Sequence, residues 1–199
     1  HAADCELMDT RLITDRKTPF FYEEHRGPFN RTLGAFNSLY IGGVAHELGH
    51  ALGLPHNREH IEEKRTLGTA LMGSGNYTYR HELWGEKGSF LTLASAIRLA
   101  SHPLFTGSDR GRWEDPRLTL DDLAFADESG GLRITGRISS SLPVYAVTAY
   151  TDPERDAGDY DALTWVSPIA DGAFEIDSND RRSGRHELRL TFCFASGAT

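Results

Sequence analysis

The stretch HELGHALGLPH, residues 46–56, has the pattern H-E-x-x-H-x-x-G-x-x-H, and it decides how the chain is interpreted. On a helix, residues four apart are separated by about 400° and about 6 Å, so His46 and His50 stack on one face as a ligand pair. Gly53 can adopt a left-handed conformation without a steric penalty and turn the chain out of the helix. His56 can then return over the same face, where the three histidines meet.

Three imidazole nitrogens with a fourth, open position are typical of a catalytic zinc site, because a structural site is closed by a fourth side chain. The sequence therefore predicts one catalytic Zn²⁺ ion, with His46, His50 and His56 as ligands and the open position for water. Glu47 lies beside the first ligand and is predicted to accept a proton from that water. The alternative is that these histidines are ordinary core or surface residues, but burying them with Glu47 on one face would be costly without a metal.

The helical periodicity around this motif defines the expected local structure. Residues 37–53 place apolar side chains three and four positions apart and predict one helix, with Asn37 or Ser38 as its N-cap and Gly53 as its end. An apolar stripe over residues 90–100 predicts a second helix.

The second half of the chain has the period of β-strands. Apolar and polar residues alternate over 132–138 and again over 187–194, which predicts half-buried strands. Residues 143–150 are apolar on both faces, as in a central strand. Residues 162–177 predict a hairpin that turns at Asp171–Gly172. Several short strands at regular spacing favour a β-sandwich.

A change in composition and periodicity along the sequence predicts two domains. Residues 104–120 are rich in Gly, Asp, Arg and Pro without a sustained period, as expected of a linker. We therefore expect one domain over residues 1–107 and a β-sandwich, either complete or incomplete, over residues 115–199.

The motif at residues 46–56 resembles the zinc signature of the metzincin metallopeptidases, whose other mark is a methionine in a turn beneath the metal. Met72 lies between small residues and matches this Met-turn. In some metzincins a tyrosine two residues after that methionine binds the zinc or stabilises the transition state, but here that position is Ser74. Tyr77 and Tyr79 remain open alternatives for this role.

The resemblance covers residues 35–105 and implies a zinc-dependent endopeptidase that acts on proteins or peptides. It implies an α+β fold, in which a metzincin-like portion with active-site helix, Met-turn and C-terminal helix is followed by the all-β sandwich. In this mechanism Glu47 passes the proton of the water to the leaving amine. Metzincins have an upper half before the signature, and only 45 residues precede His46, so an N-terminally truncated catalytic portion is expected.

A competing hypothesis is a non-catalytic interaction protein, with a vestigial protease portion and a sandwich that binds protein or glycan. The intact Glu47 argues against it, because a vestige has no chemical reason to keep the base. A zinc hydrolase that acts on a non-peptide amide would have the same residues.

Charge and composition restrict the partners. The formal net charge is −8, from 21 Lys and Arg against 29 Asp and Glu, and no basic run indicates a nucleic-acid surface. No stretch approaches the roughly 18 consecutive apolar residues of a membrane span. The acidic and basic run at 58–65 is predicted to be a solvated face, and His60 an ordinary surface histidine. Cys5 and Cys193 indicate neither a bridge nor a compartment, a secreted or cell-surface location is implied by the family resemblance alone, and the oligomeric state is left open.

Overall fold

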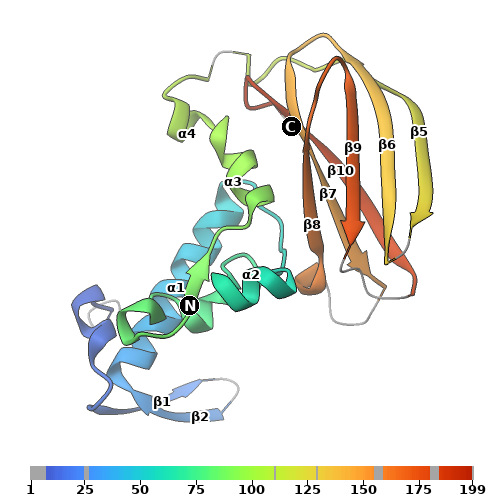
Figure 1. Cartoon of the computed structure of the whole chain (residues 1–199). Coiled ribbons are helices and arrows are strands. Elements are labelled where there is room, and N and C mark those ends of the chain that lie inside the picture. The colour runs from blue at the N-terminus through green and yellow to red at the C-terminus, as the bar shows by residue number, and fades with distance from the viewer. Residues whose placement is uncertain are drawn as a thin grey trace. The chain divides into compact units, whose positions relative to one another are not determined.

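The computed structural model forms two compact units, which Figure 1 shows as a ribbon. The first unit comprises His1–Pro55 and Ile61–Phe90, and the second comprises His56–His60 and Leu91–Thr199. The structure describes residues 8–24, 27–109, 111–128, 130–154, 159–179 and 184–198. This grouping assigns the helix after Phe90 to the second unit. The predicted division into residues 1–107 and 115–199 stays a prediction, which proteolysis can test.

The first unit is built around one long helix, α1 (Leu33–Ala51). It is preceded by a 3-10 helix, η2 (Thr10–Thr14), and by an antiparallel pair of strands, β1 (Pro19–Glu24) and β2 (Gly27–Thr32). Figure 1 shows this pair at the N-terminal end of α1. After α1 come α2 (Ile61–Thr66), β3 (Gly68–Ala70), η3 (Gly75–Thr78), η4 (His81–Trp84) and β4 (Gly88–Phe90), and β3 pairs in parallel with β4.

Aromatic rings fix the β1–β2 pair against α1. The ring centroid of Phe36 lies 4.6 Å from that of Phe20, 5.1 Å from that of Tyr22 and 4.6 Å from that of Tyr40. Phe36 is buried, so these rings form the apolar contact between the strands and the helix.

The helix α1 begins earlier than the sequence predicted. Thr32 is its N-cap, and the Thr32 hydroxyl accepts a hydrogen bond from the Ala35 amide at 3.2 Å. The predicted N-caps, Asn37 and Ser38, are therefore wrong, because both lie inside the first turns and are fully buried. Instead of capping, the side-chain oxygen of Asn37 accepts a hydrogen bond from the Asp9 amide at 2.7 Å.

The strands of the second unit form two antiparallel sheets of three strands each, in the orders β5-β6-β9 and β10-β7-β8. Figure 1 shows the two sheets face to face. Ile134, Val147, Phe174 and Ile176 are buried between them and form the centre of the core. The strands are β5 (Leu118–Glu128), β6 (Gly131–Ser140), β7 (Val144–Pro153), β8 (Leu163–Pro168), β9 (Ala173–Asn179) and β10 (His186–Phe194), and the helices of this unit are α3 (Leu93–Ala100), α4 (Pro103–Thr106) and η5 (Asp159–Asp161).

Most of the predicted strands are confirmed. Residues 132–138 lie in β6, residues 187–194 lie in β10, and residues 144–150 lie in β7, the central strand of its sheet. The strand β5 was not predicted, because its side chains are largely exposed and a register shift between Asp121 and Ala124 interrupts its alternation.

The predicted hairpin over residues 162–177 is wrong, although its turn is present. Asp171 and Gly172 have φ values of 51° and 72°, and Ala170 and Ala173 form a single antiparallel bridge around them. However, β8 pairs with β7 and β9 pairs with β6, so the two strands belong to different sheets. The turn therefore carries the chain from one sheet to the other.

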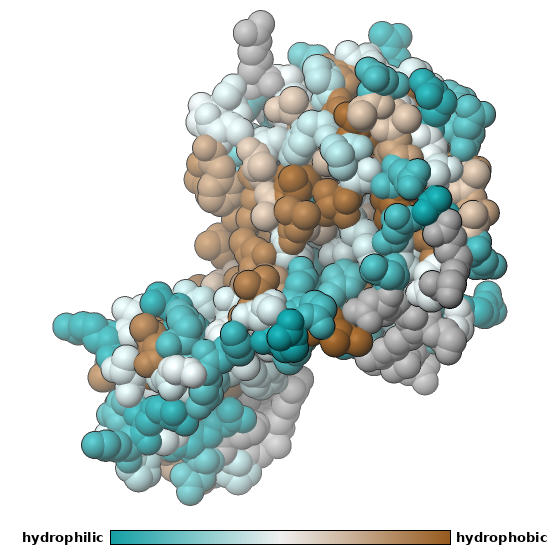
Figure 2. Space-filling view, in the orientation of Figure 1, coloured by the Kyte–Doolittle hydropathy of each residue, from teal (hydrophilic) through white to brown (hydrophobic). Residues whose placement is uncertain are grey.

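The surface of the second unit exposes apolar side chains on α3 and α4. Leu93, Leu104 and Phe105 are exposed there, and Figure 2 shows brown side chains over these helices. Among the described residues, no helix combines the length and the apolar character needed to cross a membrane.

Candidate metal centre

The end of α1 brings the chain back toward the helix. The Gly53 amide donates to the His50 carbonyl at 2.9 Å and the Leu54 amide donates to the Gly49 carbonyl at 3.0 Å, the two hydrogen bonds of a Schellman motif. Gly53 has a φ of 84°, a left-handed conformation that a glycine adopts without strain. The turn predicted at Gly53 is therefore confirmed.

Backbone carbonyl groups fix the orientation of the two helical histidines. The Nδ1 atom of His46 lies 2.6 Å from the Leu71 carbonyl oxygen, and the Nδ1 atom of His50 lies 2.8 Å from the Leu54 carbonyl oxygen. A carbonyl oxygen only accepts hydrogen bonds, so each Nδ1 carries the proton and donates it. In the neutral rings, Nε2 then presents a lone pair.

The two Nε2 atoms of His46 and His50 lie 3.0 Å apart. Two lone pairs that face each other at this distance repel, unless one ring takes up an additional proton or a cation accepts both pairs. Ring nitrogens of His46, His50 and His56 all lie within 4.8 Å of one another. The structure therefore brings together the three predicted ligands, and a borderline divalent cation such as Zn²⁺ fits this all-nitrogen donor set.

Glu47 stands apart from this donor set. Its side chain is exposed on α1, one position after His46. Among the described residues, the His, Cys, Asp and Glu side chains that could hold a metal are the three histidines alone. Glu47 is therefore not part of this donor group, and its role as the base stays a prediction.

Met72 packs directly beneath the metal-site helix. The side chain is 1% exposed, and a Cβ atom added at Gly49 would overlap its sulfur atom. The preceding residue, Leu71, provides the carbonyl group that holds His46. Two successive residues after β3 therefore contact α1. Leu71 holds the His46 side chain, and Met72 packs against Gly49.

Tyr77 and Tyr79 follow this segment, in and directly after η3. Tyr77 is exposed, and the carbonyl oxygen of Tyr79 accepts a hydrogen bond from the Ser38 hydroxyl at 2.5 Å. A Cβ atom added at Gly42 would overlap Tyr79. Tyr79 thus packs on α1 one to two turns before His46, and its role and that of Tyr77 at the metal stay open.

The segment that carries the third histidine is held in a way that the sequence did not indicate. The His56 ring stacks on Tyr160, with centroids 3.7 Å apart and 27° between the planes. Arg58 donates from its amide to the Ala162 carbonyl at 2.9 Å and from its guanidinium to Asp161 at 3.2 Å.

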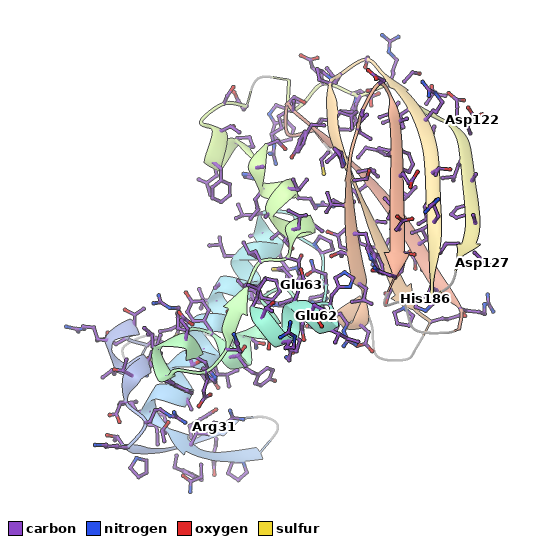
Figure 3. The ribbon with its side chains drawn as sticks, in the orientation of Figure 1. Arg31, Glu62, Glu63, Asp122, Asp127 and His186 are labelled. Carbon is purple, nitrogen blue, oxygen red and sulfur yellow. The ribbon has the colours of Figure 1, made fainter. Side chains whose placement is uncertain are left out.

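His60 continues this set of contacts, so its assignment as an ordinary surface histidine is wrong. Its Nε2 atom lies 2.7 Å from the Thr164 carbonyl oxygen, and its ring packs edge-on against Trp165 at 5.0 Å. The solvated face predicted for residues 58–65 is confined to α2, where no residue is buried. Glu62 and Glu63, labelled in Figure 3, belong to that helix, whereas Glu59 is buried.

The residue after the third histidine points into a buried polar cluster. The side-chain amide nitrogen of Asn57 donates to the Ser95 hydroxyl at 2.9 Å. The Thr92 hydroxyl donates to the side-chain oxygen of Asn57 at 3.1 Å. Thr92 is also the N-cap of α3. Asn57 thus contacts Thr92 and Ser95, whereas His56 and Arg58 contact residues 160–162. The partners of Asn57 lie 35 to 38 residues away in the sequence, which is why local patterns could not reveal them.

Comparisons with known proteins find similar solved structures. No protein-family model matches the chain, and no curated protein sequence matches it significantly. Among solved structures, the chain is similar to wild-type OgpA from Akkermansia muciniphila, with a TM-score of 0.73 and 29% identity over 83% of this chain and 49% of that chain. It is also similar to catalytically inactive OgpA in complex with an O-glycopeptide (glycodrosocin) substrate, with a TM-score of 0.72 and 29% identity over 83% of this chain and 48% of that chain.

The chain thus spans about half the length of the solved structures that it matches. OgpA is an enzyme that has been crystallised with a glycopeptide substrate. The likeness extends over 83% of this chain, and the three-histidine group within it could bind a metal ion.

Proposed function

We propose that the chain is the zinc-dependent peptidase portion of a metzincin-like endopeptidase, in which His46, His50 and His56 hold one catalytic zinc ion and Glu47 is the base. The observation that carries this proposal is the pair of Nε2 atoms 3.0 Å apart, each in a ring whose Nδ1 faces a carbonyl oxygen. The third histidine within 4.8 Å completes a donor set for a cation. The similarity to OgpA supports the peptidase part of the proposal.

The chemistry divides between the metal and the chain. When bound, zinc acts as a Lewis acid that polarises the scissile carbonyl and makes water a better nucleophile. Glu47 accepts a proton from the attacking water as the water oxygen bonds to the carbonyl carbon. When the carbon–nitrogen bond breaks, Glu47 returns that proton to the departing amine. The base is thereby regenerated, and the products are a carboxyl group and an amine.

Met72 supports assignment to the metzincins in particular. It lies in the turn after β3 and packs against Gly49, between the two helical histidines in the sequence. A turn that carries a methionine beneath the zinc is the second mark of that family. In this proposal, Met72 is a structural residue that fixes the floor of the site.

The proposed substrate class is a peptide, and O-glycosylated peptides are the first to test. OgpA was crystallised with such a substrate, and its structure matches 83% of this chain. This chain spans about half of OgpA, and the assays below use the full-length protein.

The substitution Glu47→Gln tests the mechanism in the full-length protein. Glutamine keeps the size of the side chain but cannot accept the proton, so turnover of peptide and O-glycopeptide substrates should fall by about 10²- to 10⁴-fold. Zinc content, measured by mass spectrometry of the metal, should stay at the wild-type level, because Glu47 is not a ligand. Glu62→Gln is the matched control, since Glu62 is an exposed carboxylate on α2 that should change neither quantity.

The outcomes separate the hypotheses. Loss of zinc together with activity in Glu47→Gln would make Glu47 part of the metal binding. Full activity in that variant would refute the mechanism. A wild-type protein that holds zinc but hydrolyses neither substrate would favour the non-catalytic interaction protein.

A further inference from the structure

The third histidine differs from the other two in how it is held. His46 and His50 belong to α1, and carbonyl groups fix their Nδ1 atoms. His56 lies after the end of that helix, five residues beyond Ala51, so no helix sets its position. Its ring is half-buried and stacks on Tyr160 with a centroid distance of 3.7 Å.

We propose that Tyr160 is a positioning residue for the third metal ligand, His56, whose imidazole it holds by ring stacking. This inference rests on the proposed function, because it assumes that His56 binds the ion. Tyr160 belongs to η5, between β7 and β8, and lies 104 residues after His56 in the sequence.

The residues beside the two rings anchor both of them to the same framework. Arg58, two positions after His56, pairs with Asp161 and donates its amide to the carbonyl group of Ala162. Ala162 is fully buried against Tyr150 in the core of the unit. The segment of His56 and the segment of Tyr160 are therefore joined by hydrogen bonds next to the stacked rings.

Stacking on Tyr160 restricts the rotation of the His56 imidazole, which decides where its ring nitrogens point. A ring that lies nearly parallel to a neighbour, here at 27°, can slide but cannot easily rotate about its Cα–Cβ bond into another rotamer. Groups that orient a metal-binding histidine change metal affinity by about 10- to 100-fold when they are removed. Tyr160 is half exposed, so its removal exposes the outer face of His56 and creates no large core cavity.

The test compares Tyr160→Ala with Tyr160→Phe in the full-length protein. Tyr160→Ala removes the ring, and the dissociation constant for zinc, measured by competition with a chromophoric chelator, should rise by about 10- to 100-fold. Tyr160→Phe keeps the stacked ring and should bind zinc as the wild type does. The visible spectrum of the Co²⁺-substituted protein should change in intensity for the alanine variant and remain unchanged for phenylalanine.

Phe125→Ala provides the matched control. Phe125 is an aromatic residue of the same unit, on β5, with 53% exposure against 51% for Tyr160. This variant should keep both the zinc affinity and the Co²⁺ spectrum. Thermal unfolding of the metal-free proteins separates a local effect from loss of the fold, and the Tyr160→Ala midpoint should stay near that of Phe125→Ala.

Each result counts for or against the inference. Wild-type zinc affinity in Tyr160→Ala would overturn it and leave the proposed function intact. An equal loss in Tyr160→Ala and Tyr160→Phe would also overturn it, because the hydroxyl group and not the stacked ring would then be responsible. A wild-type protein that binds no zinc would remove both the proposed function and the inference.

Discussion

Gly49 is the residue of α1 where packing beneath the metal site leaves no room for a side chain. A Cβ atom there would overlap the Met72 sulfur, and Met72 is buried. Gly49→Ala should therefore lower the free energy of unfolding by about 1–3 kcal/mol, the usual effect of overpacking a core. Urea-induced unfolding of the metal-free protein measures this change without any contribution from the ion.

The same helix offers a control for that substitution. A Cβ atom added at Gly43 would meet nothing within 4 Å, so Gly43→Ala should raise the free energy of unfolding by about 0.5–1 kcal/mol through better helix propensity. If Gly49→Ala were as stabilising as Gly43→Ala, Met72 would not pack against Gly49 as described, and the support for a Met-turn would be lost.

Among the elements, α1 shows which features local sequence can predict. Its end was predictable, because Gly53 has no Cβ atom and adopts the left-handed conformation without strain, and the hydrogen bonds of that turn are local. The start was not, because Thr32, Asn37 and Ser38 are all good N-cap residues. The choice of Thr32 depends on the packing of Asn37 against Asp9, which is distant in the sequence.

Strand pairing shows the same limit. The turn at Asp171–Gly172 was predictable from its residues, but the partners of β8 and β9 were not. A two-residue turn of this type usually joins paired strands, so the local signal favoured a hairpin. The actual pairing depends on β7 and β6, which precede both strands in the chain.

The candidate site divides in the same way. The three histidines and Glu47 are close in the sequence, and the spacing that the metal requires reveals them. Tyr160 carries no such signal, because it lies in a polar segment and meets His56 only through the fold. The local sequence thus predicts the metal ligands, whereas a residue that holds a ligand in place can be identified only from the long-range packing of the fold.

At the scale of the whole molecule, the connection between α4 and β5 is the expected site of proteolysis. It contains Arg112 and Arg117, which trypsin can recognise, and the residues of it that the structure describes form no helix or strand. A cut there should leave two fragments that elute together under native conditions, because α3 packs on β8 and the Tyr145 hydroxyl bonds to the Ile97 carbonyl group.

Two results would contradict that account. Cuts within both parts while this connection stays intact would show that the predicted linker is not a boundary. Fragments that separate on a native sizing column would show that α3 does not belong to the second unit. Mass spectrometry of the eluted fragments identifies the bonds that were cut.

The central claim is that the three histidines form one metal site, and zinc stoichiometry tests it most directly. After exhaustive dialysis, the wild-type protein should hold about one zinc ion per chain and lose it to a strong chelator. His50→Ala removes one of the two Nε2 atoms that face each other, and it should lower the zinc content to near zero. His186→Gln, at the start of β10 in Figure 3, should keep about one zinc ion. An unchanged zinc content in His50→Ala would contradict the account.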